Sequence, residues 1–173
     1  TISKAGLRRI LRAPLAPSKE PGGCRLLPPA WRARVHSDDL AMRKVLVVED
    51  SASTRAFVRA VLEDGTFADK VGGTQVAEAT CGFDAMRLLP RGPYDLIVTD
   101  INMSDINGLE LIHFIRKSEH HRTTPLVIIS TQNTKQDVER GLALGANAFV
   151  AKPFSAEQLR ATCFKLLGVD AGG

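Results

Sequence analysis

Residues 95–103 read Asp-Leu-Ile-Val-Thr-Asp-Ile-Asn-Met, an apolar run that ends on a carboxylate. Residues 45–51, Val-Leu-Val-Val-Glu-Asp-Ser, show the same pattern earlier in the chain. Nearly unbroken apolar runs of this kind are typical of strands buried on both faces of a parallel sheet. We predict five strands, of which four are nearly unbroken: Val45–Glu49, Gln75–Ala79, Asp95–Thr99, Leu126–Ser130 and Ala148–Ala151.

Helical patterns lie between the predicted strands. Apolar residues recur at helical spacing in the first and the last of these stretches, at Phe57, Val58, Val61 and Leu62 and at Leu159, Cys163, Leu166 and Leu167. Two stretches begin in the pattern of a capping box or close to it, with Asn107 before Glu110 and Ser155 before Gln158. The alternation predicts an α/β fold, a doubly wound five-stranded parallel sheet with five helices.

The residues that end the strands suggest a chemistry. In a doubly wound sheet the site lies beyond the carboxyl ends of the strands, and here those ends carry Glu49 and Asp50, Asp100, Ser130 and Thr131, and Lys152. Carboxylates held together repel one another, and Mg²⁺ with oxygen ligands relieves that repulsion. An incoming phosphoryl group would be neutralised by the metal and Lys152, while one carboxylate attacks phosphorus to form an aspartyl phosphate.

Composition limits the class of protein. The 173 residues are 44% hydrophobic and 24% charged, which is enough apolar material for one domain with a sizeable core. The apolar runs are far shorter than the roughly 20 residues that a membrane-spanning helix needs. Three cysteines, Cys24, Cys81 and Cys163, form no metal-binding pattern and leave one unpaired in any disulfide scheme. We therefore expect a cytoplasmic protein with no membrane segment.

The net charge of +4 is concentrated in residues 1–41. This segment holds eight Lys or Arg residues against three acids, together with five of the nine prolines. We interpret it as a disordered, basic, Pro/Arg-rich N-terminal extension that matters little for function. A basic arm that contacts nucleic acid or an anionic membrane, with Trp31 as its aromatic platform, and a transit peptide are the alternatives.

From Met42 to Gly168 the chain closely resembles the receiver domain of bacterial two-component response regulators of the chemotaxis type. The resemblance rests on the run 45–51, the run 95–103, Ile129-Ser-Thr and Ala151-Lys-Pro-Phe154, and it includes five strand-end landmarks in the right order and spacing. It implies a flavodoxin-like sheet with the strand order 2-1-3-4-5. Residues 42–168 would then form the receiver domain, and residues 169–173 a short tail.

The resemblance also implies roles for individual residues. Asp100 would be the phosphoacceptor, and Mg²⁺ would be held by Asp50, Asp100 and the backbone carbonyl of Asn102, with Glu49 acting through a metal-bound water. Lys152 would pair with the acceptor and later with its phosphoryl group. The peptide bond between Lys152 and Pro153 would be cis. Ser130 and Phe149 would form a switch pair that responds to phosphorylation.

Some residues depart from the family pattern or stand outside it. Ser104 occupies a position where the family usually has proline, and Thr131 replaces a customary small residue beside the switch hydroxyl. We expect residues 65–73 to form a mobile loop. We expect Glu119, His120 and His121 to lie in a solvated connection, and Cys81 and Cys163 to be small core residues.

The resemblance implies a phosphorylation-dependent signalling switch that is not an enzyme in the ordinary sense. Its partners would be a histidine kinase or a phosphotransfer domain and a protein effector, which would bind the face formed by residues 134–144, 149–152 and 155–167. Because few residues follow the last predicted helix, we expect no DNA-binding domain on that side, and a phosphorylation-dependent homodimer stays open. The alternatives are a phosphorylation-independent binding module, an aspartyl-phosphate phosphatase and a flavodoxin. The phosphatase would need a carboxylate where Asn102 stands, and the flavodoxin would need a glycine-rich loop after the first strand.

Overall fold

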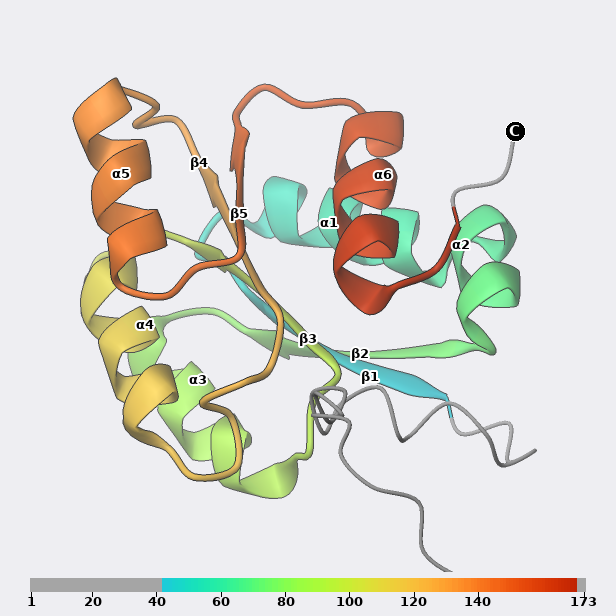
Figure 1. Ribbon diagram of the computed structural model, residues 1–173, viewed down its shortest axis with the longest axis horizontal. Coiled ribbons are helices and arrows are strands. Elements are labelled where there is room, and N and C mark those ends of the chain that lie inside the picture. Colours follow the sequence, from blue (N-terminus) through green and yellow to red (C-terminus); the bar gives the residue numbers. More distant parts are fainter. Residues whose placement is uncertain (1–41, 171–173) are drawn as a thin grey trace, which may run out of the picture. The chain divides into compact units, whose positions relative to one another are not determined.

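The computed structural model describes residues 42–170, which form a five-stranded parallel sheet covered by helices on both faces (Figure 1). The predicted N-terminal extension and residues 171–173 of the predicted tail lie outside the described residues. The sheet order is β2-β1-β3-β4-β5, which confirms the order that the resemblance implied. The strands are β1 Arg43–Val48, β2 Thr74–Ala79, β3 Leu96–Asp100, β4 Leu126–Ser130 and β5 Ala148–Ala151.

Six α-helices lie within residues 42–170, one more than the sequence predicted. They are α1 Ala52–Glu63, α2 Gly65–Val71, α3 Gly82–Leu88, α4 Gly108–Lys117, α5 Lys135–Ala143 and α6 Ala156–Leu167, with a single 3₁₀ turn, η2, at Leu89–Arg91. The capping box predicted at Ser155 is present, because its hydroxyl and the side chain of Gln158 each bond the other residue's backbone amide. In the described part of the chain, no helix combines the length and the apolar character needed to cross a bilayer.

The additional helix is α2, and it corrects the prediction of a mobile loop at residues 65–73. Asp64 caps this helix by accepting a hydrogen bond from the amide of Thr66, and Gly72 ends it with a φ of 83°. Phe67 and Val71 lie four residues apart on one buried face. The ring of Phe67 stacks on Phe164 of α6 with 4.8 Å between ring centroids. Tertiary packing therefore stabilises a helix whose glycine-rich flanks suggested a loop.

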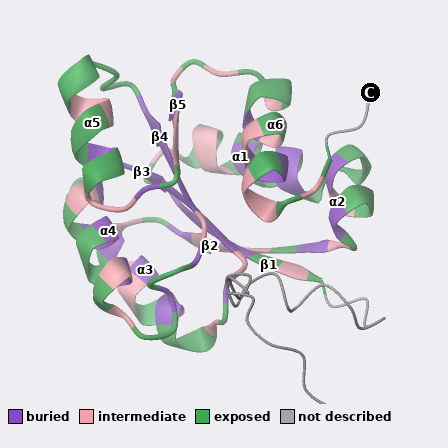
Figure 2. Ribbon diagram, in the orientation of Figure 1, coloured by how far each residue is buried: buried purple, intermediate pink, exposed green. Residues whose placement is uncertain are grey.

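The alternation of side chains along each strand divides the core into two layers. Val45 and Val47 of β1 face a layer formed with α1, α2 and α6. Leu46 and Val48 of the same strand face the opposite layer, formed with α3 and α4. Figure 2 shows that the central strands β1, β3 and β4 are largely buried, whereas the edge strands β2 and β5 are only partly buried. Both faces of the sheet are thus covered, as the unbroken apolar runs predicted.

Arg116 fastens the edge of the sheet where β4 begins. Its guanidinium group, at the end of α4, donates to the carbonyl oxygens of Gly145, His121 and Thr124 and to Oδ1 of Asn147, at distances of 2.9 to 3.0 Å. Burial lowers the pKa of this guanidinium from its ordinary value. One side chain therefore joins α4, the connection into β4 and the connection into β5.

His121 and Cys81 differ from their predicted surroundings. His121 is only 2% exposed, and its Nε2 donates to the carbonyl oxygen of Leu89 at 2.9 Å. The prediction of a solvated connection at His121 is therefore wrong, because a distant carbonyl and the ring of Tyr94, 5.7 Å away, bury it. Cys163 is buried in the core as predicted, whereas Cys81 is only partly buried at the start of α3.

Candidate functional site

The strand register places the predicted site residues side by side at the carboxyl edge of the sheet. Val48 pairs with Thr99, so that the next residues, Glu49 and Asp100, are neighbours. Ser130 pairs with Ala151, which puts Lys152 beside it. The sheet alone thus brings together residues at the ends of β1, β3, β4 and β5 that are up to about a hundred positions apart in the sequence.

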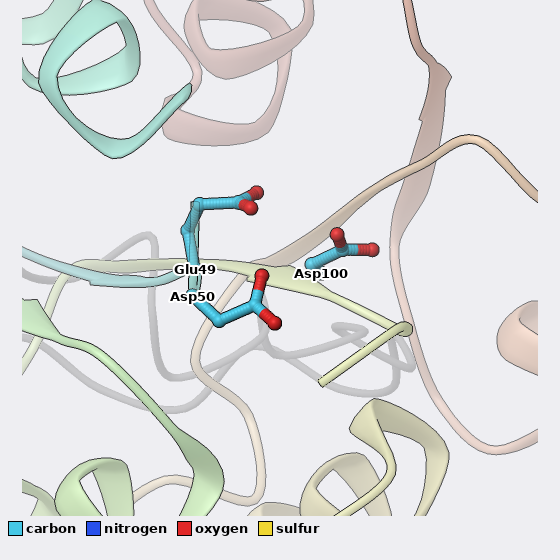
Figure 3. Close-up of side chains that lie close together, drawn as sticks. All are labelled: Glu49, Asp50 and Asp100. Carbon is cyan, nitrogen blue, oxygen red and sulfur yellow. The ribbon is translucent and has the colours of Figure 1, made fainter. Parts of the chain in front are cut away.

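Three carboxylates converge at this edge (Figure 3). Glu49, Asp50 and Asp100 each offer an oxygen, and these oxygens all lie within 4.8 Å of one another. Glu49 and Asp100 are buried, with 0% and 4% of their surfaces exposed, whereas Asp50 is exposed. Two buried carboxylates therefore lie beside a third that faces solvent, and like charges held this close repel one another.

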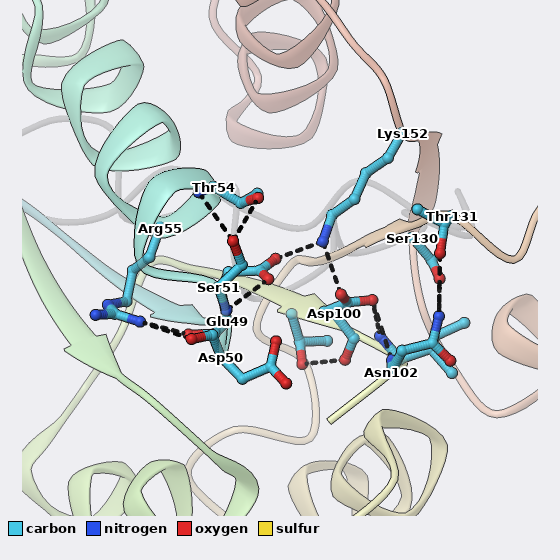
Figure 4. A network of polar contacts seen from close by, with 12 residues as sticks. Glu49, Asp50, Ser51, Thr54, Arg55, Asp100, Asn102, Ser130, Thr131 and Lys152 are labelled. Carbon is cyan, nitrogen blue, oxygen red and sulfur yellow. Dashed lines mark hydrogen bonds and ion pairs between the residues drawn. The ribbon is translucent and has the colours of Figure 1, made fainter. Parts of the chain in front are cut away.

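Lys152 spans the two buried carboxylates (Figure 4). Its Nζ donates to Oε2 of Glu49 at 2.6 Å and to Oδ2 of Asp100 at 2.7 Å. Its peptide bond to Pro153 is cis, as the resemblance implied. One ammonium group thus contacts two of the three carboxylates and leaves Asp50 without a contact to it.

Burial and pairing shift the pKa values of this cluster. Burial raises the pKa of Glu49 above its ordinary value, although the hydrogen bond from Lys152 partly opposes the rise. For Lys152, burial works to lower the pKa, but the hydrogen bonds to Asp100 and Glu49 outweigh it and the pKa is raised. Lys152 is therefore a cation at neutral pH.

The backbone after β3 orients the carboxylate of Asp100. Its Oδ1 accepts hydrogen bonds from the amides of Ile101 at 2.6 Å and Asn102 at 3.1 Å, while Oδ2 binds Lys152. The segment then closes on itself, because the amide of Gly108 donates to the carbonyl oxygen of Ile101 at 2.9 Å. A Cβ atom at Gly108 would lie 2.1 Å from the carbonyl oxygen of Asp100, so only glycine permits this close approach.

Asn102 connects the acceptor segment to β4. Its Nδ2 donates to the hydroxyl oxygens of Ser130 and Thr131, each at 3.3 Å. Ser130 is fully buried, and its hydroxyl oxygen also accepts a hydrogen bond from the amide of Gln132. The structure therefore brings Ser130 and Thr131 together with the carboxylates, as the positions of the strand ends predicted, and places Asn102, which the resemblance implied, between them.

Phe149 lies further from the carboxylates along β5. It is partly buried against the layer formed with α3 and α4, and it pairs in register with Ile128, two residues before Ser130. This position is compatible with core packing and with the predicted switch role alike.

Arg55 belongs to the site and was not predicted. It is on α1, and its guanidinium group donates to the carbonyl oxygens of Glu49 at 2.9 Å and Asp50 at 3.4 Å. Its Nε also lies 3.7 Å from Oε1 of Glu78 on β2. Arg55 thus holds the backbone from which two of the carboxylates project. No local pattern indicates this role, because Glu78 is brought close only by the folded sheet.

A cavity of about 450 Å³ opens beside Lys152. It is lined by Ser53, Thr54, Phe57, Thr131, Lys152, Pro153 and Phe154. The rings of Phe57 and Phe154 approach with 5.9 Å between their centroids, and Phe57 is 41% exposed. A group in this cavity would therefore contact Lys152, whose ammonium group binds Asp100.

The donor set fits Mg²⁺. Hard divalent cations take carboxylate and carbonyl oxygens and retain water, and this edge offers three carboxylates of which one faces solvent. Because Lys152 neutralises only part of the negative charge, a cation would relieve the remaining repulsion. An acidic cluster of this kind is typical of the magnesium site of receiver domains.

Comparison with known proteins agrees with this geometry. Residues 45–164 match the family described as the response regulator receiver domain. The chain is 31% identical over 130 residues to the chemotaxis protein CheY homolog of Campylobacter jejuni, which covers 75% of this chain and 95% of that protein. It is 30% identical over 117 residues to the chemotaxis protein CheY of Pseudomonas aeruginosa, covering 68% and 90% of the two chains.

Solved structures give the same result. The chemotaxis response regulator CheY4 of Vibrio cholerae matches with a TM-score of 0.65 and 30% identity, over 72% of this chain and 98% of that one. The receiver domain of the sensor histidine kinase PA1611 from Pseudomonas aeruginosa, solved with a magnesium ion coordinated in the active site cleft, matches with a TM-score of 0.63 and 26% identity. That match covers 74% of this chain and 99% of the other.

A doubly wound sheet with an acidic, lysine-bridged site at its carboxyl edge defines a receiver-type signalling domain. The chain belongs to the response regulator receiver domain family. Within that family it is similar to the chemotaxis regulators, so it is a signalling switch rather than an enzyme.

Proposed function

We propose that this protein is a response regulator that accepts a phosphoryl group on Asp100 from a histidine kinase or a phosphotransfer domain and changes its binding to a protein effector as a result. The observation that carries the proposal is the position of Asp100, which is buried, oriented by two backbone amides and paired with Lys152. A buried carboxylate held in one orientation beside a fixed cation is arranged for nucleophilic attack on phosphorus.

Each residue of the site has a separate role in the proposed phosphoryl transfer. One carboxylate oxygen of Asp100 bonds to phosphorus while the bond from phosphorus to the donor nitrogen breaks, and the donor imidazole leaves with that electron pair. Lys152, released from Asp100, neutralises the transferred phosphoryl oxygens. Bound Mg²⁺ would supply further positive charge, held by Asp50, Asp100 and the carbonyl oxygen of Asn102, with Glu49 acting through water.

The hydroxyl group of Ser130 would change its position when Asp100 is phosphorylated. This hydroxyl lies on the strand next to Asp100 and is held by Asn102 in this structure. Phosphorylation replaces the single negative charge of the Asp100 carboxylate with a phosphoryl group that carries about −1.5 to −2 charge, and its oxygens would draw the hydroxyl toward them. The movement of the hydroxyl would change the position of Phe149 through β4 and β5. This change would alter the surface formed by α5, β5 and α6, to which an effector would bind.

Phosphatase activity is the weaker alternative. Such chemistry needs a general acid two residues after the nucleophile, and Asn102 occupies that position with its amide bonded to two hydroxyl groups. A phosphorylation-independent binding module stays open. The cytoplasmic location expected from the cysteines also stays a prediction.

Intact-protein mass spectrometry tests the proposed function. Wild type incubated with acetyl phosphate and Mg²⁺ should gain one phosphoryl mass, and Asp100→Asn should gain none, because an amide oxygen is a poor nucleophile. EDTA should remove the gain in wild type. If wild type gains no mass under conditions that label a known receiver domain, the binding-module alternative is favoured.

Thr131→Ala is expected to shorten the lifetime of the phosphorylated protein. Thr131 lines the cavity beside Lys152 and its hydroxyl accepts a hydrogen bond from Asn102, so it narrows the path of attacking water and restrains its neighbour. Loss of one such contact, about 0.7 kcal/mol, corresponds to dephosphorylation about threefold faster. Loss of radiolabel after removal of the donor measures the rate. Ser53→Ala, which changes another residue of the same cavity, is the control, and equal rates for Thr131→Ala and wild type would contradict this expectation.

A further inference from the structure

Asp105 caps a helix that is distant in sequence. Asp105 lies in the connection between β3 and α4, five residues after the acceptor. Its Oδ1 accepts a hydrogen bond from the amide of Gly82 at 3.0 Å, and its Oδ2 accepts one from the amide of Phe83 at 2.9 Å. These are the first two amides of α3, which cannot bond within their own helix. The residue at the N-cap of α3, Cys81, makes no capping hydrogen bond with its side chain.

The start of α3 and the connection between β3 and α4 lie very close together at this contact. A Cβ atom at Gly82 would lie 2.7 Å from Cβ of Ile106 and 3.3 Å from its carbonyl oxygen, so glycine is needed for the two segments to meet. The same connection is closed at its far end by the hydrogen bond from Gly108 to Ile101. The segment between Asp100 and α4 is thus held by the hydrogen bond that joins its two ends, Ile101 and Gly108, and by the contact of Asp105 with α3.

The charge state of Asp105 agrees with this contact. Loss of water contact works to raise the pKa of Asp105, but hydrogen bonds from the amides of Phe83, Gly82 and Ile106 outweigh it and hold the pKa well below its usual range. The carboxylate is therefore ionised at neutral pH, and it faces the positive end of a helix.

We propose that Asp105 is a positioning residue for the metal site: by fixing the acceptor segment to α3, it holds Asn102 where its carbonyl oxygen and its side chain are needed. Asn102 lies three residues before Asp105, between the acceptor and the capping contact. Its amide binds Asp100 and its side chain binds Ser130, so a shift of this segment would disturb the acceptor and the switch hydroxyl together. The proposal rests on the proposed function, since it assumes Mg²⁺ at the carboxylates.

Magnesium affinity, measured on the whole chain, separates positioning from simple stability. Asp105→Ala removes both capping bonds, and its dissociation constant for Mg²⁺ should rise about tenfold, the lower end of the range for residues that orient metal ligands. Asp64→Ala is the matched control, because it removes the cap of α2 on the other face of the sheet. Both variants should melt at lower temperature, but Asp64→Ala should change the dissociation constant less than twofold. Amide NMR spectra recorded during a Mg²⁺ titration give the dissociation constant and show which residues respond.

A second variant keeps the test decisive. Asp105→Asn retains a capping oxygen, so it should remain folded and weaken Mg²⁺ binding less than Asp105→Ala does. Unchanged Mg²⁺ affinity in both variants, with wild type still labelled at Asp100, would overturn the positioning role alone. Equal weakening by Asp64→Ala would also overturn it. Wild type that neither binds Mg²⁺ nor gains a phosphoryl group would instead overturn the proposed function.

Discussion

Lys152→Met is expected to abolish measurable phosphoryl transfer to Asp100 and to destabilise the metal-free protein. Lys152 is the cation that contacts the buried carboxylates of both Glu49 and Asp100, and methionine replaces it with an uncharged side chain of similar length. Leaving buried carboxylates without their partner costs about 3 kcal/mol in the free energy of unfolding near neutral pH. Phosphoryl transfer would also lose the charge that neutralises the incoming group.

Urea unfolding at two pH values, with and without Mg²⁺, checks this expectation. The pKa of Glu49 is already raised by burial, so without Lys152 this carboxyl takes up a proton more readily as the pH falls. The loss of stability should therefore be greatest near pH 7 and smaller below about pH 5. Mg²⁺ should stabilise the variant more than it stabilises wild type, because it then replaces the missing positive charge.

A surface lysine provides the control for Lys152→Met. Lys135 and Glu139 form an ion pair at 3.8 Å on α5, and the lysine side chain is 91% exposed. Lys135→Met should change the free energy of unfolding by less than about 0.5 kcal/mol. If Lys152→Met were as stable as Lys135→Met at pH 7 and were still labelled, Lys152 would not have the role assigned to it.

Gly108→Ala is expected to destabilise the protein strongly, although it adds only a single methyl group. The added Cβ would lie 2.1 Å from the carbonyl oxygen of Asp100 and 2.7 Å from Cα of Ile101, and both are backbone atoms that no side-chain rotation can move. Relief requires α4 to move away from the end of β3, at a cost of about 3 kcal/mol. Because that end carries the acceptor, phosphoryl labelling should fall as well.

Gly65→Ala is the matched control for Gly108→Ala. Both glycines are the first residue of a helix, α2 and α4 respectively. A Cβ atom at Gly65 meets only the flexible side chain of Asp69, at 3.4 Å. Its substitution should leave stability unchanged or raise it slightly, since alanine reduces the freedom of the unfolded chain. Urea midpoints of the two variants measure the difference, and similar midpoints would show that the connection after β3 tolerates expansion.

The parts of the fold that depend on local pattern were predictable. The five strands were located to within two residues at either end, because a strand covered on both faces needs an uninterrupted apolar run. The convergence of Glu49, Asp50, Asp100, Ser130 and Lys152 was also predictable, since parallel strands bring their carboxyl ends to one edge. The order of the strands came from the resemblance and not from these patterns.

The errors arose where distant contacts decide the structure. The spacing of Phe67 and Val71 after a capping Asp64 was a signal for α2, but the glycines nearby favoured a loop. His121 is buried by a carbonyl oxygen 32 positions away. Asp105 acts on the backbone of α3, and Arg55 pairs with Glu78; only the folded sheet brings these groups near, so no local pattern identified either contact.

The guanidinium of Arg116 makes the two edges of the sheet respond differently to the medium. Its four acceptors are three carbonyl oxygens and an asparagine oxygen, none of which gains or loses a proton. Arginine itself stays charged throughout the accessible pH range. At the opposite, carboxyl edge, three carboxylates and an ammonium group lie beside the hydroxyl of Ser130 and the amide of Asn102. Acidity, salt and divalent cations therefore act on the charged groups of the carboxyl edge, whereas the four hydrogen bonds of Arg116 have neutral acceptors whose charge none of these conditions changes.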